Sequence, residues 1–305
     1  MLKETYYSRL SANEKKVYFE IVKGLQKRKT RIKISSNPSN ELPYSILNDH
    51  PELFYWDYTK WQVEDSLFGK YMLLNYAYPE ALSNELDARA ENIAKVICNG
   101  DEESTVRAIH NYLIKTVTYD HNNMLDKENH SIVGPLINSK GVCEGISRTF
   151  QFLLNKCGID CAVIEGVLEG ENHMWNVVSI NGYNYHIDVT SDIGLTEKRW
   201  KKPSYFYYML TDDEIKNTHK YKDNFGCFQT KDNPFYKNGR VFNNQYELER
   251  FLSSVPTRQR LINFKYIGNL TEDEIYYIGC KSIRMGLFSS YLTFKTNANT
   301  YYFYR

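Results

Sequence analysis

The chain has 305 residues, of which 42% are hydrophobic and 25% charged, and its formal net charge is +1. These values are typical of a soluble globular protein, and the near-neutral balance excludes a global field that would draw the chain to nucleic acid or to an acidic membrane. The chain starts without the apolar segment of a signal peptide and has no stretch approaching the ~18 apolar residues of a membrane span, so we expect a cytoplasmic protein with no nucleic-acid and no membrane partner.

The amino-terminal region, residues 1–100, is expected to be a helical and mixed support region. Residues 11–14 form a capping-box pattern that predicts the start of a helix. The basic run over 27–33 is interpreted as the solvated end of that helix, because charge runs usually lie on solvated faces. Aromatic residues and chain breakers over 42–78 indicate short strands and loops, and a second helix is expected over 83–98.

The middle region, residues 101–225, is expected to hold an α+β core. Apolar residues at helical spacing predict one helix over 102–117. A second apolar stripe predicts a buried helix that begins at Cys143 and is stopped by a glycine fifteen residues later. Three strands are then expected, and they span 161–168, 172–180 and 183–189.

The last region, residues 226–305, is expected to be a small α+β unit. It contains a predicted helix that Pro256 ends and a second helix that begins near Thr271. Paired strands at 291–294 and 301–304 complete the unit. The chain has no internal repeat and no low-complexity segment.

The dipeptide Asn181-Gly182 between two alternating runs is a strong signal for a β-hairpin with a two-residue type I′ turn. Such a turn fixes the register, so that Ile180 pairs with Tyr183 and every later pair follows from it. A register slip of one residue would move every side chain to the other face of the sheet.

In this register, His173 and Asp188 are diagonal neighbours on one face, with backbone positions ~7–8 Å apart. A carboxylate at that place can accept a hydrogen bond from the imidazole, fix its tautomer and stabilise the imidazolium. Two alternatives stay open. The face could be only the wet side of a half-exposed sheet, and His186 lies two residues from Asp188 on the same face and could replace His173.

Cys143 lies where the buried helix begins, in the string Gly-Val-Cys-Glu-Gly. A thiol at a helix amino terminus meets unpaired amides and the positive end of the helix dipole, which favours the thiolate and could support an oxyanion. The flanking glycines, Gly145 among them, would let a substrate carbonyl approach the backbone closely. The alternative is a small buried apolar side chain, which is how most intracellular cysteines are used.

The other cysteines give no sign of chemistry. Six cysteines are too few for a disulfide framework in a chain of this length. Cys157 and Cys161 are interpreted as buried apolar residues, because one lies on the helical stripe and the other starts a strand. Zinc binding by Cys143 with these two and His173 is discounted, since no paired C-x2-C spacing is present and the helix separates Cys143 from Cys157 by ~20 Å. We expect no metal and no cofactor.

Three strings stand in a fixed order along the chain: Gly141-Val142-Cys143-Glu144-Gly145, His173-Met174-Trp175-Asn176 and Tyr185-His186-Ile187-Asp188-Val189-Thr190. Together they resemble the transglutaminase-like superfamily. Residues 109–120 look like the helix and strand that precede the cysteine in bacterial members. The good match covers about residues 104–195, and the carboxy-terminal eighty or so residues match no family.

The resemblance implies a papain-like α+β core in which a helix bearing the cysteine packs on an antiparallel sheet. It also implies roles for three residues: Cys143 as nucleophile, His173 as general base and then acid, and Asp188 as the orienting carboxylate. Trp175 could wall the acyl site or be plain packing. Tyr119 could donate to an oxyanion or be an ordinary strand aromatic.

Members of this family cross-link glutamine to amines, cleave peptides, remove glycans from asparagine or have lost activity. Their shared step is attack of a thiolate on an amide carbonyl to form a thioester, which an amine or water then releases. We expect hydrolysis of a peptide or protein substrate, because water is the default acceptor in an open site. The alternative is an inactive binding or scaffolding module that keeps the fold and holds a partner in its aromatic groove.

Overall fold

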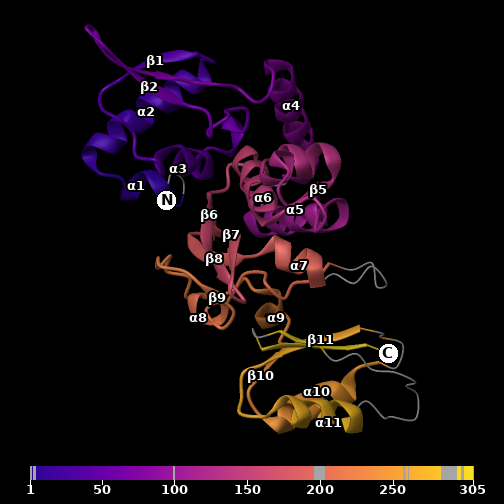
Figure 1. Ribbon diagram of the computed structural model, residues 1–305. Helices are drawn as coiled ribbons and strands as arrows, with labels where there is room; N and C mark the ends of the chain where they lie inside the picture. Colours follow the sequence, from indigo (N-terminus) through magenta and orange to yellow (C-terminus); the bar gives the residue numbers. More distant parts are fainter. Residues whose placement is uncertain are drawn as a thin grey trace.

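The computed structural model describes residues 2, 5–98, 100–195, 203–256, 259, 261–282, 294–296 and 299–304. Its three regions follow one another down the molecule, with the carboxy-terminal unit at the end farthest from the amino-terminal sheet (Figure 1). In the described part, no helix combines the length and the apolar character needed to cross a membrane.

The amino-terminal region consists of four α-helices, one 3-10 turn and a small antiparallel sheet of order β1-β3-β2. The elements are α1 (Thr5–Arg9), α2 (Ala12–Gln26), β1 (Arg31–Ile34), α3 (Leu42–Asp49), η1 (Pro51–Leu53), β2 (Gln62–Ser66), β3 (Gly69–Leu73) and α4 (Glu80–Ile97). The predicted capping box is present, with Ser11 and Glu14 bonding each other's backbone. The basic run is not a helix end as predicted, because α2 stops at Gln26 and the run continues through a turn into β1.

The middle region confirms the predicted papain-like α+β core. Its elements are α5 (Glu102–Thr116), β4 (Thr118–Tyr119), η2 (Lys127–His130), η3 (Gly134–Asn138), β5 (Lys140–Gly141), α6 (Cys143–Lys156), β6 (Cys161–Leu168), β7 (Glu171–Ile180), β8 (Tyr183–Ile187), α7 (Val189–Leu195), α8 (Asp212–Ile215) and β9 (His219–Lys220). The main sheet is antiparallel in the order β8-β7-β6-β9.

Helix α6 packs on the central strand β7 and is also bonded to it. Ser147 Oγ donates to the carbonyl of Met174 at 2.9 Å, and Asn176 Nδ2 donates to the carbonyl of Ser147 at 3.0 Å. These bonds fix the height of α6 against the sheet, and with it the position of Cys143 at the helix start.

The predicted hairpin register is confirmed. Asn181 and Gly182 both have positive φ, 52° and 78°, as a type I′ turn requires. Pairing then runs from Ile180 with Tyr183 to Asn176 with Ile187. The second strand is shorter than predicted, because Asp188 accepts the Ser191 N–H at 3.0 Å and so caps α7.

The carboxy-terminal unit is α+β with its own cluster of buried residues. Its elements are α9 (Pro234–Lys237), β10 (Val241–Phe242), α10 (Gln245–Ser254), β11 (Leu261–Tyr266), α11 (Glu272–Ser282), β12 (Phe294–Thr296) and β13 (Thr300–Tyr304). Strands β12 and β13 pair as predicted, although 291–293 of the first predicted strand lie outside the described residues. A buried ion pair from Lys265 to Glu214 of α8 joins this unit to the core.

One cluster of buried residues runs through the amino-terminal and middle regions, from α2 to the segment after α7. A disulfide between Cys98 and Cys157, with α-carbons 5.8 Å apart, further ties the end of α4 to the end of α6. The prediction that Cys157 is merely a buried apolar residue was therefore wrong. Disulfides are rare in the cytoplasm, so this pair counts against the expected cytoplasmic location.

Candidate active site

The structure brings Cys143, His173 and Asp188 together. The imidazole Nε2 of His173 donates to Asp188 Oδ2 at 2.9 Å, and the Cys143 thiol lies close enough to the ring to raise its pKa. Asp188 is fully buried, whereas Cys143 is partly exposed. Each residue stands at the end or near the start of an element: Cys143 begins α6, His173 is the third residue of β7, and Asp188 follows β8.

The imidazole and the carboxylate stabilise each other's charge. Burial alone would lower the pKa of His173, but the Asp188 charge, the hydrogen bond to Asp188 and the neighbouring Cys143 thiol outweigh burial and raise the pKa of His173 to about 10. Burial likewise disfavours ionised Asp188, yet the charge and N–H of His173 and the N–H of His219 hold the pKa of that carboxyl well below its usual range. The pair therefore exists as imidazolium and carboxylate at neutral pH.

His219 is a third member of this cluster that the sequence did not predict. Its Nε2 is 3.1 Å from the same Asp188 oxygen that His173 contacts, and its other nitrogen is 2.7 Å from Thr218 Oγ1. His219 arrives there because β9 pairs with the end of β6, with Leu168 opposite His219. Nothing in the local sequence signals this pairing, since β9 is two residues long and follows a long connection.

The hairpin face that carries His173 is dry, so the alternative of a wet sheet face was wrong. Trp175 and His186 are both completely buried. The Trp175 indole donates to His186 Nδ1 at 3.0 Å, and His186 Nε2 is 2.9 Å from Asp212 Oδ1. His186 is therefore bonded to Asp212 and does not replace His173. Trp175 stacks on His173 with ring centroids 6.1 Å apart and is not among the residues that line the cleft, which favours plain packing over a wall of the acyl site.

Two clusters of metal-ligating side chains occur in the described part of the chain: His173 with Asp188 and His219, and His186 with Asp212 and Cys227. In both, the imidazoles and carboxylates already bond one another. In the second, burial and the Asp212 charge raise the pKa of the Cys227 thiol, which disfavours the thiolate that a metal would need. Neither cluster calls for a metal. The zinc set discounted from the sequence cannot form, because Cys157 is in a disulfide.

A cleft of about 850 Å³ opens over Cys143 and His173. Tyr119 lines it and lies close to Cys143, whose side chain and backbone both influence the pKa of the Tyr119 hydroxyl. Burial, with the nearby Cys143 and Glu171, raises the pKa of Tyr119. Tyr119 thus stands beside Cys143 in the cleft, and its role as an oxyanion donor stays a prediction.

Gly145 serves the fold, in contrast to its predicted contact with substrate. A Cβ there would lie 2.2 Å from the carbonyl oxygen of Asn129 and 2.8 Å from that of Ser131. The absent side chain lets this loop pack against the first turn of α6. The same loop bonds to the strand entering the helix, since Val142 N–H donates to the Asn129 carbonyl at 3.1 Å.

Three solved structures are similar to the chain at low identity. One is described as "a TGase" (16% identity, 46% of this chain and 45% of that chain, TM-score 0.31). The second is "a Putative Cysteine Protease" from Cytophaga hutchinsonii (12% identity, 43% and 61%, TM-score 0.30). The third is "a Putative Protease" from Parabacteroides distasonis ATCC 8503 (9% identity, 79% and 54%, TM-score 0.28). The chain spans about half of the length of these structures.

The family match is more specific than these likenesses. No curated protein matches the chain. Residues 91–189 match the family model described as the transglutaminase-like superfamily, a stretch that runs from α4 to the residue after Asp188. It contains the cysteine helix, the hairpin and all three residues of the Cys143, His173 and Asp188 arrangement. Residues 91–189 of this chain belong to the transglutaminase-like superfamily.

Proposed function

We propose that this protein is a cysteine-dependent acyl-transfer enzyme that attacks an amide carbonyl through Cys143, and that its main reaction is hydrolysis of a peptide or protein amide. The observation that supports it best is the position of His173, which lies beside the Cys143 thiol and bonds the buried Asp188. This arrangement lies under an open cleft of about 850 Å³, large enough for a segment of polypeptide.

In the first step, Cys143 reacts as a thiolate while His173 carries the proton: Sγ forms a bond to the carbonyl carbon, and the π electrons of the carbonyl move to its oxygen. The Cys143 backbone N–H at the start of α6 is placed to donate to that oxygen. The tetrahedral intermediate collapses to a thioester, and the C–N bond breaks as the His173 imidazolium gives its proton to the leaving nitrogen. Asp188 keeps the imidazole oriented throughout and is not itself protonated.

In the second step, neutral His173 takes a proton from water as the water oxygen attacks the thioester carbon. Collapse of this intermediate breaks the C–S bond and returns the sulfur as thiolate beside the imidazolium. A primary amine could replace water and give transfer in place of hydrolysis. The open cleft favours water, because nothing in the described part of the chain excludes it from the acyl group.

One observation favours a second candidate, a binding module without catalysis. Tyr119 lines the cleft beside Cys143, where a substrate carbonyl would have to bind. If Tyr119 keeps the carbonyl away from Cys143, the cleft would still hold a polypeptide and no thioester would form.

The test combines thiol labelling with product analysis. Iodoacetamide at pH 6 is expected to alkylate Cys143, and the label should be lost in Cys143→Ala and kept in the matched control Cys161→Ala. Cys161 is a fair control because it is a free cysteine that is fully buried, and burial raises the pKa of its thiol.

The same proteins are then incubated with a peptide mixture, with and without methylamine, and products are identified by mass spectrometry. Products that gain water indicate hydrolysis, and products that gain methylamine indicate transfer. Consumption of peptides that persists in Cys143→Ala would refute the assignment of the nucleophile. A labelled Cys143 with no product of either kind would support the binding module.

A further inference from the structure

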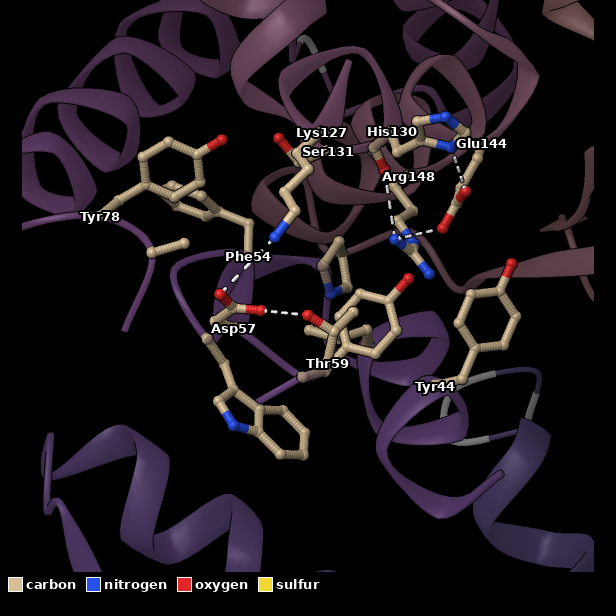
Figure 2. Close-up of a pocket in the computed structure, with 15 residues that line it drawn as sticks. Tyr44, Phe54, Asp57, Thr59, Tyr78, Lys127, His130, Ser131, Glu144 and Arg148 are labelled. Atoms are coloured by element: carbon tan, nitrogen blue, oxygen red, sulfur yellow. Dashed lines mark hydrogen bonds and ion pairs between the residues drawn. The ribbon is translucent and has the colours of Figure 1, made fainter. Parts of the chain in front are cut away.

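A second hollow adjoins the active-site cleft, between the amino-terminal region and the first turns of α6 (Figure 2). Its volume is about 370 Å³, at the lower end of the range of pockets that hold small molecules, about 300–1,000 Å³. Tyr44, His130 and Glu144 line both hollows, and Glu144 directly follows Cys143 in the chain. A polypeptide bound over Cys143 therefore runs past this second hollow.

Aromatic rings dominate its lining, and we call it the aromatic pocket. The rings belong to Tyr44, Phe54, Trp56, Tyr58 and Tyr78. They also contact one another, with ring centroids 6.0 Å apart for Tyr44 and Tyr58 and 5.8 Å apart for Phe54 and Tyr78. The lining suits a flat apolar group that can stack on one ring or meet another edge-on.

The charged groups of the aromatic pocket already neutralise one another. Arg148 pairs with Glu144 at 2.7 Å, and His130 contacts the other Glu144 oxygen at 2.6 Å. On the far side, Asp57 is 3.6 Å from Lys127 (Figure 2). Lys60 also pairs with Asp57, at 3.4 Å. Every charged side chain of the lining therefore already has an oppositely charged partner, and a neutral ligand would disturb none of these pairs.

The guanidinium of Arg148 is held in place as part of the wall. Its two terminal nitrogens donate to the His130 carbonyl at 3.2 Å and to Asn48 Oδ1 at 2.8 Å, and its centre lies 5.2 Å from the Tyr44 ring centroid. A fixed, flat cation of this kind is a good surface for an aromatic ring.

We propose that the aromatic pocket binds a neutral aromatic side chain, tyrosine or phenylalanine, of the polypeptide whose amide Cys143 attacks. The proposal rests on the proposed function, because it needs a polypeptide at Cys143. It assigns to residues 44–78 a direct part in substrate choice.

Two series of electrophiles test it, each with one variable residue X: tyrosine, phenylalanine, alanine, lysine or glutamate. In acetyl-X-Gly chloromethyl ketones, X lies on the acyl side of the reactive carbon. In bromoacetyl-X amides, X lies on the leaving-group side. The readout is the rate of Cys143 alkylation by intact-mass spectrometry, divided by the iodoacetamide rate of the same protein, which removes differences in thiol reactivity.

The expected result is that tyrosine and phenylalanine label at least about tenfold faster than the other three residues in one of the two series, as burial of one ring predicts. Ala77→Trp should abolish this preference, because Ala77 is exposed and lines the aromatic pocket, where a large ring would fill the space. Ala81→Trp is the matched control, since Ala81 is also exposed and lies outside the lining. Thr59→Trp, at another exposed lining position, replaces Ala77→Trp if that variant does not fold.

Rates that do not depend on X in either series, or a preference that survives both filling variants, would overturn the aromatic pocket while leaving the proposed function intact. Failure of every electrophile, iodoacetamide included, to label Cys143 would instead overturn the proposed function.

Discussion

Asp188→Asn tests the electrostatics on which the candidate site depends. Asparagine keeps the size of the side chain and one acceptor oxygen for the Ser191 N–H, but it removes the negative charge beside His173. Burial then becomes the largest influence on the imidazole, and burial favours the neutral form. We expect the pKa of His173 to fall below its ordinary value.

The size of the effect follows from the pKa of His173, which is raised to about 10 in the folded protein and is about 6.5 in an unfolded chain. A raised pKa stabilises the folded state fully below the unfolded value, and the contribution is lost as the pH rises through the folded value. Linkage gives about 4 kcal/mol at pH 7 and about 1.5 kcal/mol at pH 9. The lowered pKa of Asp188 acts in the opposite range: its contribution is lost only in acid and is constant between these two pH values.

The assay is urea unfolding of wild type and Asp188→Asn at pH 7 and pH 9, followed by tryptophan fluorescence. The difference in unfolding free energy between the two proteins should shrink by about 2–3 kcal/mol from pH 7 to pH 9. The matched control is Asp212→Asn. Burial lowers the pKa of its partner His186 despite the Asp212 carboxylate, so no such pH dependence is expected there. If the difference in unfolding free energy between wild type and Asp188→Asn is the same at pH 7 and pH 9, the imidazolium–carboxylate pair is refuted. Packing and neutral hydrogen bonds would then account for the whole difference.

Three further replacements test the scaffold of the site. Gly145→Ala should lower the free energy of unfolding by about 3 kcal/mol or more, seen as a lower thermal midpoint, because its Cβ would meet the Asn129 carbonyl at 2.2 Å. Gly194→Ala, which has open space around it, should be tolerated. Cys98→Ser should lower the free energy of unfolding by about 4 kcal/mol, the chain-entropy value for a disulfide that closes a loop of 59 residues. The stability of the variant should no longer respond to reductant, and a response would contradict the pairing. His219→Phe removes a donor to a buried carboxylate and should cost about 1.5–3 kcal/mol in urea unfolding, while His219→Gln, which keeps an N–H, should recover part of that loss.

The parts of the site that the sequence predicted are those that short-range rules determine. A type I′ turn at Asn181 fixes the pairing of a hairpin without reference to the rest of the chain, and the observed register agrees with it. An apolar stripe with a clear start likewise places Cys143 at a helix amino terminus. Capping was harder to foresee at Asp188, because a carboxylate at the end of a strand can equally continue the strand or begin a helix.

The parts that were missed all depend on distant segments meeting. His219 enters the site through a two-residue strand, Cys157 finds its disulfide partner 59 residues away, and the aromatic pocket is assembled from the amino-terminal region and α6. No periodicity or motif in the chain encodes these encounters. Their residues are individually unremarkable in sequence: a histidine in a polar segment, a cysteine on an apolar stripe, and tyrosines among many other tyrosines.

Burial of the hairpin face that carries His173 matters most for the chemistry. The hairpin pattern alone allowed His173 and Asp188 to lie on a solvated surface, where an ion pair contributes about 0–1 kcal/mol and barely perturbs either group. In the structure the chain returns over this face, with Leu2, Cys227 and the β9 segment covering it, so both residues lose most of their water. A buried charge must then be matched by its partner, which is why the pair holds its proton on the imidazole so firmly. The pKa of the proposed catalytic base is therefore set by covering segments that carry no recognisable motif. Replacements in these segments should change the pKa of His173 even where the replaced side chain does not contact His173.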